Sequence, residues 1–462
     1  MKTYQDLLNV GANEKDRKDF VWSLINEHKS SDDYKVARDA YDYYRHRNVT
    51  IRNYQKLLYR VTGEAVPDNY TANFKMAGRH FYRFITQEVS YLLGNGVTWN
   101  NEGTEDKLGT GVKTFDRQLE DAATKALWGK VAFGFYDLDH VEVFSYLEFV
   151  PLFDEMDGSM KAGVRFWQID ENKPLRATLY EMDGFTKYVW DKDGKGEDEP
   201  KRGYKAKTRA TEYEGTEIYD YTNYPTFPII PLWANPEHQS EIVGLREQID
   251  CFDLIKSGFA NTVDEASIVY WTVQNAGGMD DVDLAKFVKH MKTVHAAVVD
   301  DAGAKAESHT MEAPYASREA LLNRLDADMY RDAMALDTER IASGAVTATQ
   351  IVAAYENLNS KCDKFEYQVL DFINGILAVA GIDDEATFTR SQIVNVNETI
   401  TTLTQAGAFL DERYITEKIL TVLGDADRVE EVLSNMEQSN IDRFTGGEPV
   451  EEPAEEPPVI EE

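Results

Sequence analysis

Hydrophobic residues near the C-terminal end of the chain repeat at alternating spacings of four and three. This spacing predicts one long amphipathic helix over residues 350–380, ended by Gly381. About thirty residues of helix span roughly 45 Å. The apolar stripe of such a helix could be covered by one domain, but its length favours packing between large elements, including other copies of the chain. The positions are Ile351, Tyr355, Leu358, Cys362, Phe365, Val369, Phe372 and Ile376.

A second pattern places two helices on either side of a short β-like segment. Apolar residues at helical spacing predict helices over residues 237–266 and 316–337, and the residues between them, 268–312, favour strands and turns. A loop over 338–349, which contains Gly344 and other small residues, then leads into the long helix. Two helices that leave and return around a β insert form a projecting stalk. Such a stalk buries little apolar surface by itself.

The remaining segments mix helical and alternating patterns. From residue 129 to 233 the hydrophobic period changes to two, which predicts an antiparallel β module that ends in a cluster of prolines. The fold class is therefore α+β. Helices are predicted over 14–60, 73–93 (ended by Gly94 and Gly96), 114–128, 397–408, 411–423 and 426–440, and a strand over 388–394.

The charge of the chain limits its relation to nucleic acid. The 462 residues include 82 acids and 49 bases, for a formal net charge of -33. This balance argues against general affinity for nucleic acid, which needs cations that replace phosphate counterions. An acidic surface could still lie close to DNA without binding it tightly, and simple solubility is the other reading. The length indicates about three domains.

One segment reverses the overall charge. A local excess of bases between residues 35 and 60 could meet a phosphate backbone or an acidic neighbouring subunit, and a solvated helix face is the alternative. The bases are Lys35, Arg38, Arg45, Arg47, Arg52, Lys56 and Arg60.

The sequence offers little to a metal or a cofactor. Cys251 and Cys362 each fall on an apolar face of a predicted helix, and neither belongs to a CxxC pair, so we expect neither a zinc site nor a disulfide. This usage suits a reducing cytosol. No phosphate loop, dinucleotide fingerprint or HExxH motif occurs, and acidic pairs are expected by chance in so acidic a chain. We therefore expect no catalytic residue, no metal and no cofactor.

No apolar run approaches the length of a membrane span, and the N-terminus lacks the apolar region of a signal peptide. We expect assembly in the cytoplasm and no membrane partner. Residues after Gly447 combine glutamates with prolines and contain no base, which predicts a disordered tail.

Residues 84–97 resemble a signature of tailed-bacteriophage portal proteins, the head-to-tail connectors of siphophage type. The segment reads Phe-Ile-Thr-Gln-Glu-Val-Ser-Tyr-Leu-Leu-Gly-Asn-Gly-Val, against DQKVxYLLGxPV in the family. Thr86-Gln87-Glu88 stands where the family has Asp-Gln-Lys, and Gly96 stands where it has Pro, which changes local turn geometry. The order of elements from residue 237 onward is also similar to the family, so signature and order together are specific.

The resemblance implies the portal fold. It places a mixed α/β wing at 1–233, a helical stem at 234–267 and 314–337, a small β-containing clip at 268–313, a tunnel loop at 338–349, a long kinked helix with its return to the wing at 350–395, a helical crown at 396–445 and the acidic tail at 446–462.

The same resemblance assigns site residues. The tunnel loop, expected to narrow a DNA channel, contains Thr338, Glu339, Arg340, Ile341, Ala342, Ser343, Gly344, Ala345, Val346 and Thr347. Stem acids that could line the channel are Glu241, Glu247 and Asp250. Clip residues that could contact the motor or the adaptor are Trp271, Asp280, Asp281, Lys286, Lys289, Lys292, Asp300 and Asp301.

Function also follows from the resemblance. It implies a ring, usually of twelve subunits, at one capsid vertex of the virion, through which terminase packages DNA and through which the DNA later leaves. The implied partners are other copies of the chain, the terminase large subunit, a head–tail adaptor, capsid and scaffolding proteins, and double-stranded DNA held non-specifically.

Two alternatives remain at this point. Another head structural or adaptor protein would lack a symmetric ring with a central hole. A metal-dependent packaging nuclease would need converging carboxylates and would degrade DNA with magnesium.

Overall fold

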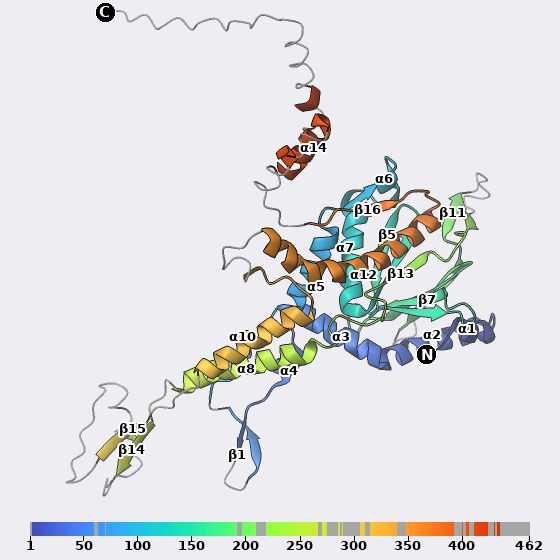
Figure 1. Cartoon of the computed structure of the whole chain (residues 1–462). Coiled ribbons are helices and arrows are strands. Elements are labelled where there is room, and N and C mark those ends of the chain that lie inside the picture. Colours follow the sequence, from blue (N-terminus) through green and yellow to red (C-terminus); the bar gives the residue numbers. More distant parts are fainter. Residues whose placement is uncertain are drawn as a thin grey trace, which may run out of the picture. The chain divides into compact units, whose positions relative to one another are not determined.

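The computed structural model of the chain describes residues 2–59, 63–69, 71–191, 196–208, 219–266, 270–274, 285–286, 289, 305–309, 315–339, 348–391, 400, 403–405, 411–423, 429 and 432–434. It forms two compact units, Met1–Ser391 and Gln392–Glu462. Most elements belong to the first unit (Figure 1).

The N-terminal segment is a series of short helices, so the prediction of continuous helix over 14–60 is wrong. Each break has a local cause. The side chain of Asn13 caps α2, and Ser31, with an extended backbone, ends α2 and caps α3 through Tyr34. His46 has a left-handed backbone at φ 59°, which separates α3 from α4. The elements are α1 (Tyr4–Val10), α2 (Glu14–Ser30), α3 (Asp32–Tyr44) and α4 (Val49–Asn53), followed by the antiparallel hairpin of β1 (Leu57–Tyr59) and β2 (Ala65–Pro67).

Helix α5 (His80–Leu93) begins later than predicted, because residues 73–79 form an irregular segment beside α8. Helix α7 (Phe115–Gly129) confirms the helix expected over 114–128. Between them lie β3 (Val97–Trp99), α6 (Thr104–Leu108) and the short helix η1 (Gly111–Lys113).

The antiparallel β module predicted over 129–233 is confirmed. One sheet has the order β13-β4-β5 and another the order β10-β9-β8-β7-β6. Aromatic contacts join the two sheets: the rings of Phe133 and Phe149 lie 4.4 Å apart and those of Phe135 and Tyr180 lie 5.2 Å apart. The strands are β4 (Val131–Asp137), β5 (His140–Ser145), β6 (Phe149–Phe153), β7 (Met160–Trp167), β8 (Leu175–Glu181), β9 (Gly184–Trp190), β10 (Glu199–Arg202), β11 (Lys205–Thr208), β12 (Tyr219–Thr222) and β13 (Ile229–Trp233).

Two antiparallel helices carry a β hairpin between them, as predicted. Helix α8 (Arg246–Ala266) leads to β14 (Tyr270–Gln274), and β15 (Lys305–His309) leads to α10 (Tyr315–Asp332). Figure 1 shows α8 and α10 side by side, with β14 and β15 at their far end. The helix expected from residue 237 begins instead at Arg246, because Gly244 has a φ of 86° and the preceding turn is held by α7: the Ser240 hydroxyl donates to the Trp128 carbonyl at 2.6 Å.

The faces of α8 differ from the prediction. Cys251, expected on an apolar face, is exposed, whereas Asp253 of the same helix is fully buried. Cys362 is buried as expected.

The long helix is confirmed as α12 (Ala348–Ala380), and its apolar seam packs within the same chain. Close approach to the β4–β13 sheet depends on two glycines. A Cβ at Gly134 of β4 would lie 2.4 Å from Phe372, and one at Gly375 would lie 2.7 Å from Ile230. The seam residues from Tyr355 to Ile376 are buried against this chain's own sheet and α5, so the expected covering of the seam by other copies is wrong for them.

The expected C-terminal elements are described in part. Strand β16 (Ala386–Phe388) pairs with β3 and ends where the strand predicted over 388–394 was to begin. In the second unit, α14 (Glu412–Leu423) confirms the helix predicted over 411–423. Most of 397–408 and 426–440, and all of the acidic tail, lie outside the described residues. No helix in the described ranges combines the length and the apolar character needed to cross a membrane.

Candidate functional site

Helix α5 holds the chain on both sides of the loop 338–349. On the N-terminal side, the Gln87 carboxamide makes a reciprocal pair with the backbone of Leu336: its nitrogen donates to the Leu336 carbonyl, and its oxygen accepts from the Leu336 amide, both at 2.9 Å. This pair fixes the chain two residues before the loop. Gln87 belongs to the stretch Thr86-Gln87-Glu88 of the signature, which gives that part of the motif a structural role.

On the C-terminal side, Glu88 of α5 forms a buried ionic triad with Lys361 of α12 and with Glu241. The Lys361 nitrogen lies 2.8 Å from a carboxylate oxygen of each glutamate. The Glu88 side chain is 2% exposed. Burial raises the pKa of Glu88 to about 7, against the opposing charge of Lys361. Burial would lower the pKa of Lys361, but the two carboxylates outweigh it and raise that pKa. One lysine therefore serves two carboxylates.

A small apolar cluster closes the space between the two flanks of the loop. It joins Tyr91 of α5, Leu336 before the loop, and Tyr355, Leu358 and Cys362 of α12. The rings of Tyr91 and Tyr355 stack 5.5 Å apart, and the Tyr91 hydroxyl donates to Asn359. Burial raises the pKa of Cys362 to about 12, so its thiol stays protonated. Leu336 before the loop and the first half of α12 after it thus pack against the same helix, α5.

A polar stripe on α8 fixes the segment before α5. Asp253, Ser257 and Asn261 follow one another at intervals of four residues and are buried. Their side-chain oxygens accept hydrogen bonds from the backbone N–H groups of Gly78 at 2.7 Å, Met76 at 2.9 Å and Phe74 at 2.7 Å, respectively.

The spacing of these three acceptors along α8 matches the spacing of the three amides along the extended segment. Four helical residues rise about 6.0 Å, and two extended residues span about 6.6 Å, so every second amide meets an acceptor one turn further along α8. We call Asp253, Ser257 and Asn261 the α8 polar stripe. It ties α8 to residues 74–78 and explains why residues 73–79 are not helical.

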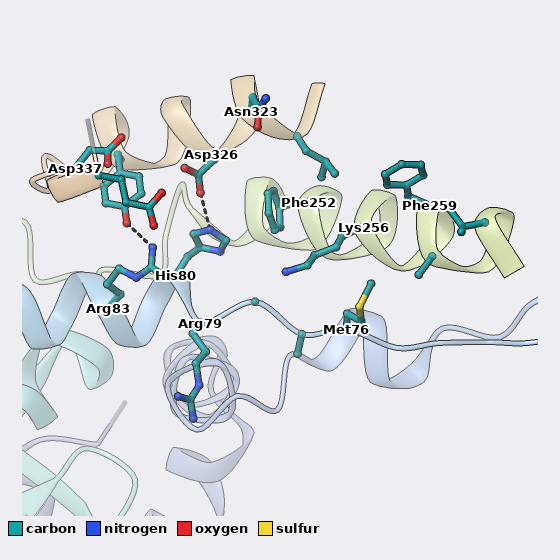
Figure 2. A pocket seen from close by; sticks show the side chains of 17 residues that line it. Met76, Arg79, His80, Arg83, Phe252, Lys256, Phe259, Asn323, Asp326 and Asp337 are labelled. Carbon is teal, nitrogen blue, oxygen red and sulfur yellow. Dashed lines mark hydrogen bonds and ion pairs between the residues drawn. The ribbon is translucent and has the colours of Figure 1, made fainter. Parts of the chain in front are cut away.

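An open cleft of about 970 Å³ lies where α5, α8 and α10 meet. Figure 2 shows His80 bonded to Asp326 of α10, and Lys256 reaching from α8 toward the segment that carries Met76. Burial lowers the pKa of His80, although its bond to Asp326 opposes this. Apolar side chains of α8, Phe252 and Phe259, form one wall, and the cleft extends to Asp337 and Glu339 at the start of the loop.

The predicted tunnel loop is described only at its ends. Thr338 and Glu339 are exposed, and α12 begins at Ala348, two residues before the predicted start of the long helix at 350. Arg340, Ile341, Ala342, Ser343, Gly344, Ala345, Val346 and Thr347 lie outside the described residues.

The stem acids occupy different settings. Glu247 is exposed on α8. Glu241 precedes α8 and belongs to the ionic triad. Asp250 accepts hydrogen bonds from Tyr43 of α3 and, at 2.7 Å, from Thr50 of α4. Their role in lining a channel stays a prediction.

The predicted clip residues are also only partly described. Trp271 lies in β14 opposite Ser308, and Lys286 and Lys289 are exposed helical residues. Asp280, Asp281, Lys292, Asp300 and Asp301 lie outside the described residues. Their contact with a motor or an adaptor stays a prediction.

The described residues bring one set of possible metal ligands together, Asp137, His140 and Glu142, within 4.8 Å of one another. The Lys113 nitrogen lies 2.6 Å from His140 Nε2 and 3.5 Å from Glu142, so a lysine cation already occupies this position. Among the acids Asp383, Asp384 and Glu385, Asp384 accepts hydrogen bonds from Asn100, Asn101 and Thr104 and so has a structural role. We assign neither set a catalytic role.

The buried carboxyls give a prediction about pH. Because the pKa of Glu88 is about 7 in the folded state and 4.5 ordinarily, its contribution to stability is fully present below pH 4.5 and is lost as pH rises through 7. Asp253, whose pKa burial raises to about 6, acts in the same direction. The free energy of unfolding of the wild type should fall between pH 5 and pH 8. In the variant Glu88→Gln this fall should be smaller by about 1–3 kcal/mol.

Urea unfolding at both pH values measures this difference. Glu247→Gln, which neutralises an exposed acid on α8, is the control and should keep the wild-type dependence. Equal pH dependence in wild type and Glu88→Gln would contradict the assignment.

Over residues 25–441 the chain matches the family described as phage portal protein, SPP1 Gp6-like. The portal protein of Clostridium phage phiCD119 is 25% identical over 182 residues, which are 37% of this chain and 40% of that protein. The chain thus spans less than half the length of this curated relative.

Solved structures of low identity are also similar. A chain of the neck of the native GTA particle computed with C12 symmetry has a TM-score of 0.42 at 10% identity, covering 74% of this chain and 89% of that one. An HK97 family phage portal protein from Corynebacterium diphtheriae has a TM-score of 0.34 at 13% identity, covering 69% and 96%. Since these TM-scores are below 0.5, the match over residues 25–441 decides the family.

Proposed function

Because the chain belongs to the SPP1 Gp6-like family of phage portal proteins, we propose that copies of it form a ring-shaped channel at one capsid vertex. Viral DNA enters through this channel during packaging and leaves through it during ejection. The family match over residues 25–441 is the observation that carries this proposal.

The stalk supports assembly into a ring, which we propose to contain twelve copies. Few residues of α8 and α10 are buried within the chain. Large apolar side chains remain exposed on both helices: Val263 is 43%, Tyr315 is 49% and Leu321 is 44% exposed. Side-by-side packing of identical stalks would cover this surface. The proposal therefore explains apolar area that one copy leaves in water.

The charge of the chain supports a channel in which DNA slides. A ring of chains that each carry a net charge of -33 repels the phosphate backbone and discourages tight binding. Glu247, exposed on α8, is the stem acid whose position best suits the channel wall. We keep Glu241 and Asp250 as candidates, although both make contacts within the chain.

We propose residues 338–349 as the tunnel loop that narrows the channel. The support of both flanks by α5 suits this role, because the Gln87 pair holds Leu336 just before the loop and the ionic triad holds α12, the helix that follows it. A loop that touches moving DNA needs such a fixed base.

We propose the segment 268–313 as the clip, which binds the terminase large subunit and later a head–tail adaptor. Its β14–β15 hairpin lies at the end of the α8–α10 pair, away from the wing sheets (Figure 1). Capsid and scaffolding proteins are the further partners we propose for the assembled ring.

Replacing residues 338–349 with a Gly–Ser linker of equal length should leave ring assembly intact and reduce DNA packaging at least tenfold. Negative-stain images of the purified protein report assembly, and nuclease-protected DNA in a packaging reaction reports function. Because the flanks are held by α5, the ring should keep its diameter.

Three results would contradict parts of this proposal. Rings that fail to form only in the linker variant would make the loop structural. A wild-type protein that never forms an annulus would favour another head component. Magnesium-dependent degradation of DNA would favour a nuclease.

A further inference from the structure

A cluster of exposed cations lies beside the base of the stalk. Arg47 follows α3, Arg52 lies in α4, and Lys75 and Arg79 lie in the segment that leads to α5. All four are exposed. Within the described part of the chain, none of them forms an ion pair, whereas Lys35 pairs with Asp32 and Lys56 with Glu265. We call Arg47, Arg52, Lys75 and Arg79 the cationic cluster.

Contacts place the members of this cluster on neighbouring segments. The Lys75 nitrogen donates to the Arg52 carbonyl at 2.7 Å. Burial, and then the positive charge of Arg79, lower the pKa of His46, which precedes Arg47. Figure 2 shows the Arg79 side chain pointing away from His80. Arg79 also lines the edge of the cleft that contains the His80–Asp326 contact, so the cationic cluster adjoins that cleft.

Large apolar side chains accompany the cations. Leu57 is 45%, Leu58 is 38% and Phe74 is 50% exposed. Leu57 and Leu58 belong to β1, which pairs only with β2 among the described strands. A lone two-stranded hairpin is marginally stable in water. A partner that covered Leu57, Leu58 and Phe74 would therefore stabilise the hairpin and remove apolar surface from water.

We propose that the cationic cluster, together with Leu57, Leu58 and Phe74, is the face by which one copy of this chain binds an acidic face of the next copy. The inference rests on the proposed ring. Contacts around a ring are heterologous, so each chain needs two different, complementary faces.

Charge and composition favour a second copy over DNA as the partner. In a chain with a net charge of -33, an unpaired basic cluster is the exception, and the remaining surface supplies acids in excess. Arginines mixed with aromatic and apolar side chains are typical of protein interfaces. Phosphate contacts alone would leave Leu57, Leu58 and Phe74 exposed.

Reversal of three charges tests this face. The variant Arg47→Glu/Arg52→Glu/Arg79→Glu should reduce the fraction of full-length protein in rings at least tenfold, measured by sedimentation velocity at a concentration where the wild type is assembled. The matched control, Lys15→Glu/Lys173→Glu/Arg176→Glu, changes the net charge equally at exposed cations elsewhere and should stay within twofold of wild type. Thermal unfolding of both variants reports folding.

Each outcome decides the inference. The inference is overturned if the reversed variant forms rings as well as the wild type does. If that variant also binds a double-stranded DNA fragment more weakly, the cluster is a phosphate contact. If the reversed variant does not fold, the Arg→Gln substitutions at the same positions decide, with a several-fold loss of rings expected. Failure of the wild type itself to form rings overturns the proposed function, a result distinguishable from the others.

Discussion

Replacing Lys361 with Met should lower the free energy of unfolding by about 3–5 kcal/mol at pH 8. The substitution leaves the carboxylates of Glu88 and Glu241 close together and largely buried without a cation. Their repulsion and desolvation are relieved when one of them binds a proton, so the loss should be smaller at pH 5. Urea unfolding at the two pH values measures both effects.

Two further variants separate the triad from the helix. Lys364→Met removes an exposed lysine from the same helix and should change stability by less than about 0.5 kcal/mol. The double variant Glu88→Gln/Lys361→Met should recover part of the loss, because only one buried carboxylate remains. Equal losses for Lys361→Met and Lys364→Met would show that the triad does not stabilise the fold.

Replacing Asp253 with Ala should destabilise the contact between α8 and the segment before α5 by about 2–3 kcal/mol. The change leaves the Gly78 amide and the Asn48 carboxamide without the acceptor they share in a buried site. Amide hydrogen exchange in a peptide covering residues 71–79 should become faster, while exchange in the β4–β13 sheet stays slow.

The control for this prediction is Glu247→Ala, which removes an exposed acid from the same helix without touching the α8 polar stripe. It should leave exchange in residues 71–79 unchanged. Slow exchange in this segment after loss of Asp253 would mean that other contacts hold it.

The hydrophobic period along the sequence was sufficient to predict the regular helices and strands. The helix of α7, the strands from β4 to β9 and the helix of α12 each have one hydrophobic face of constant period, and they form close to where that period predicts. The breaks within 14–60 were missed, although Asn13 and Ser31 are typical N-cap residues. The irregular segment 73–79 carries no such signal, because its amides bond to a distant helix.

The buried side of a helix was harder to predict from the sequence than the position of the helix along the chain. Cys251 and Asp253 both lie on α8, and hydrophobicity places the cysteine inside and the aspartate outside, the reverse of what the structure shows. The buried face of α8 is polar because it meets backbone N–H groups, which need acceptors. Gln87 and Glu88 were noted only as part of a motif, and their interruption of the apolar face of α5 was the available clue.

The sequence alone was enough to determine the family, the acidic character and the order of helices and strands, because these follow from motif, composition and period. Only the tertiary structure decided what each face meets: α12 against its own sheet, the α8 polar stripe against residues 74–78, and Lys361 between two carboxylates. A period shows which residues share a side of a helix, but the groups that these residues contact come from chain segments more than a hundred residues away.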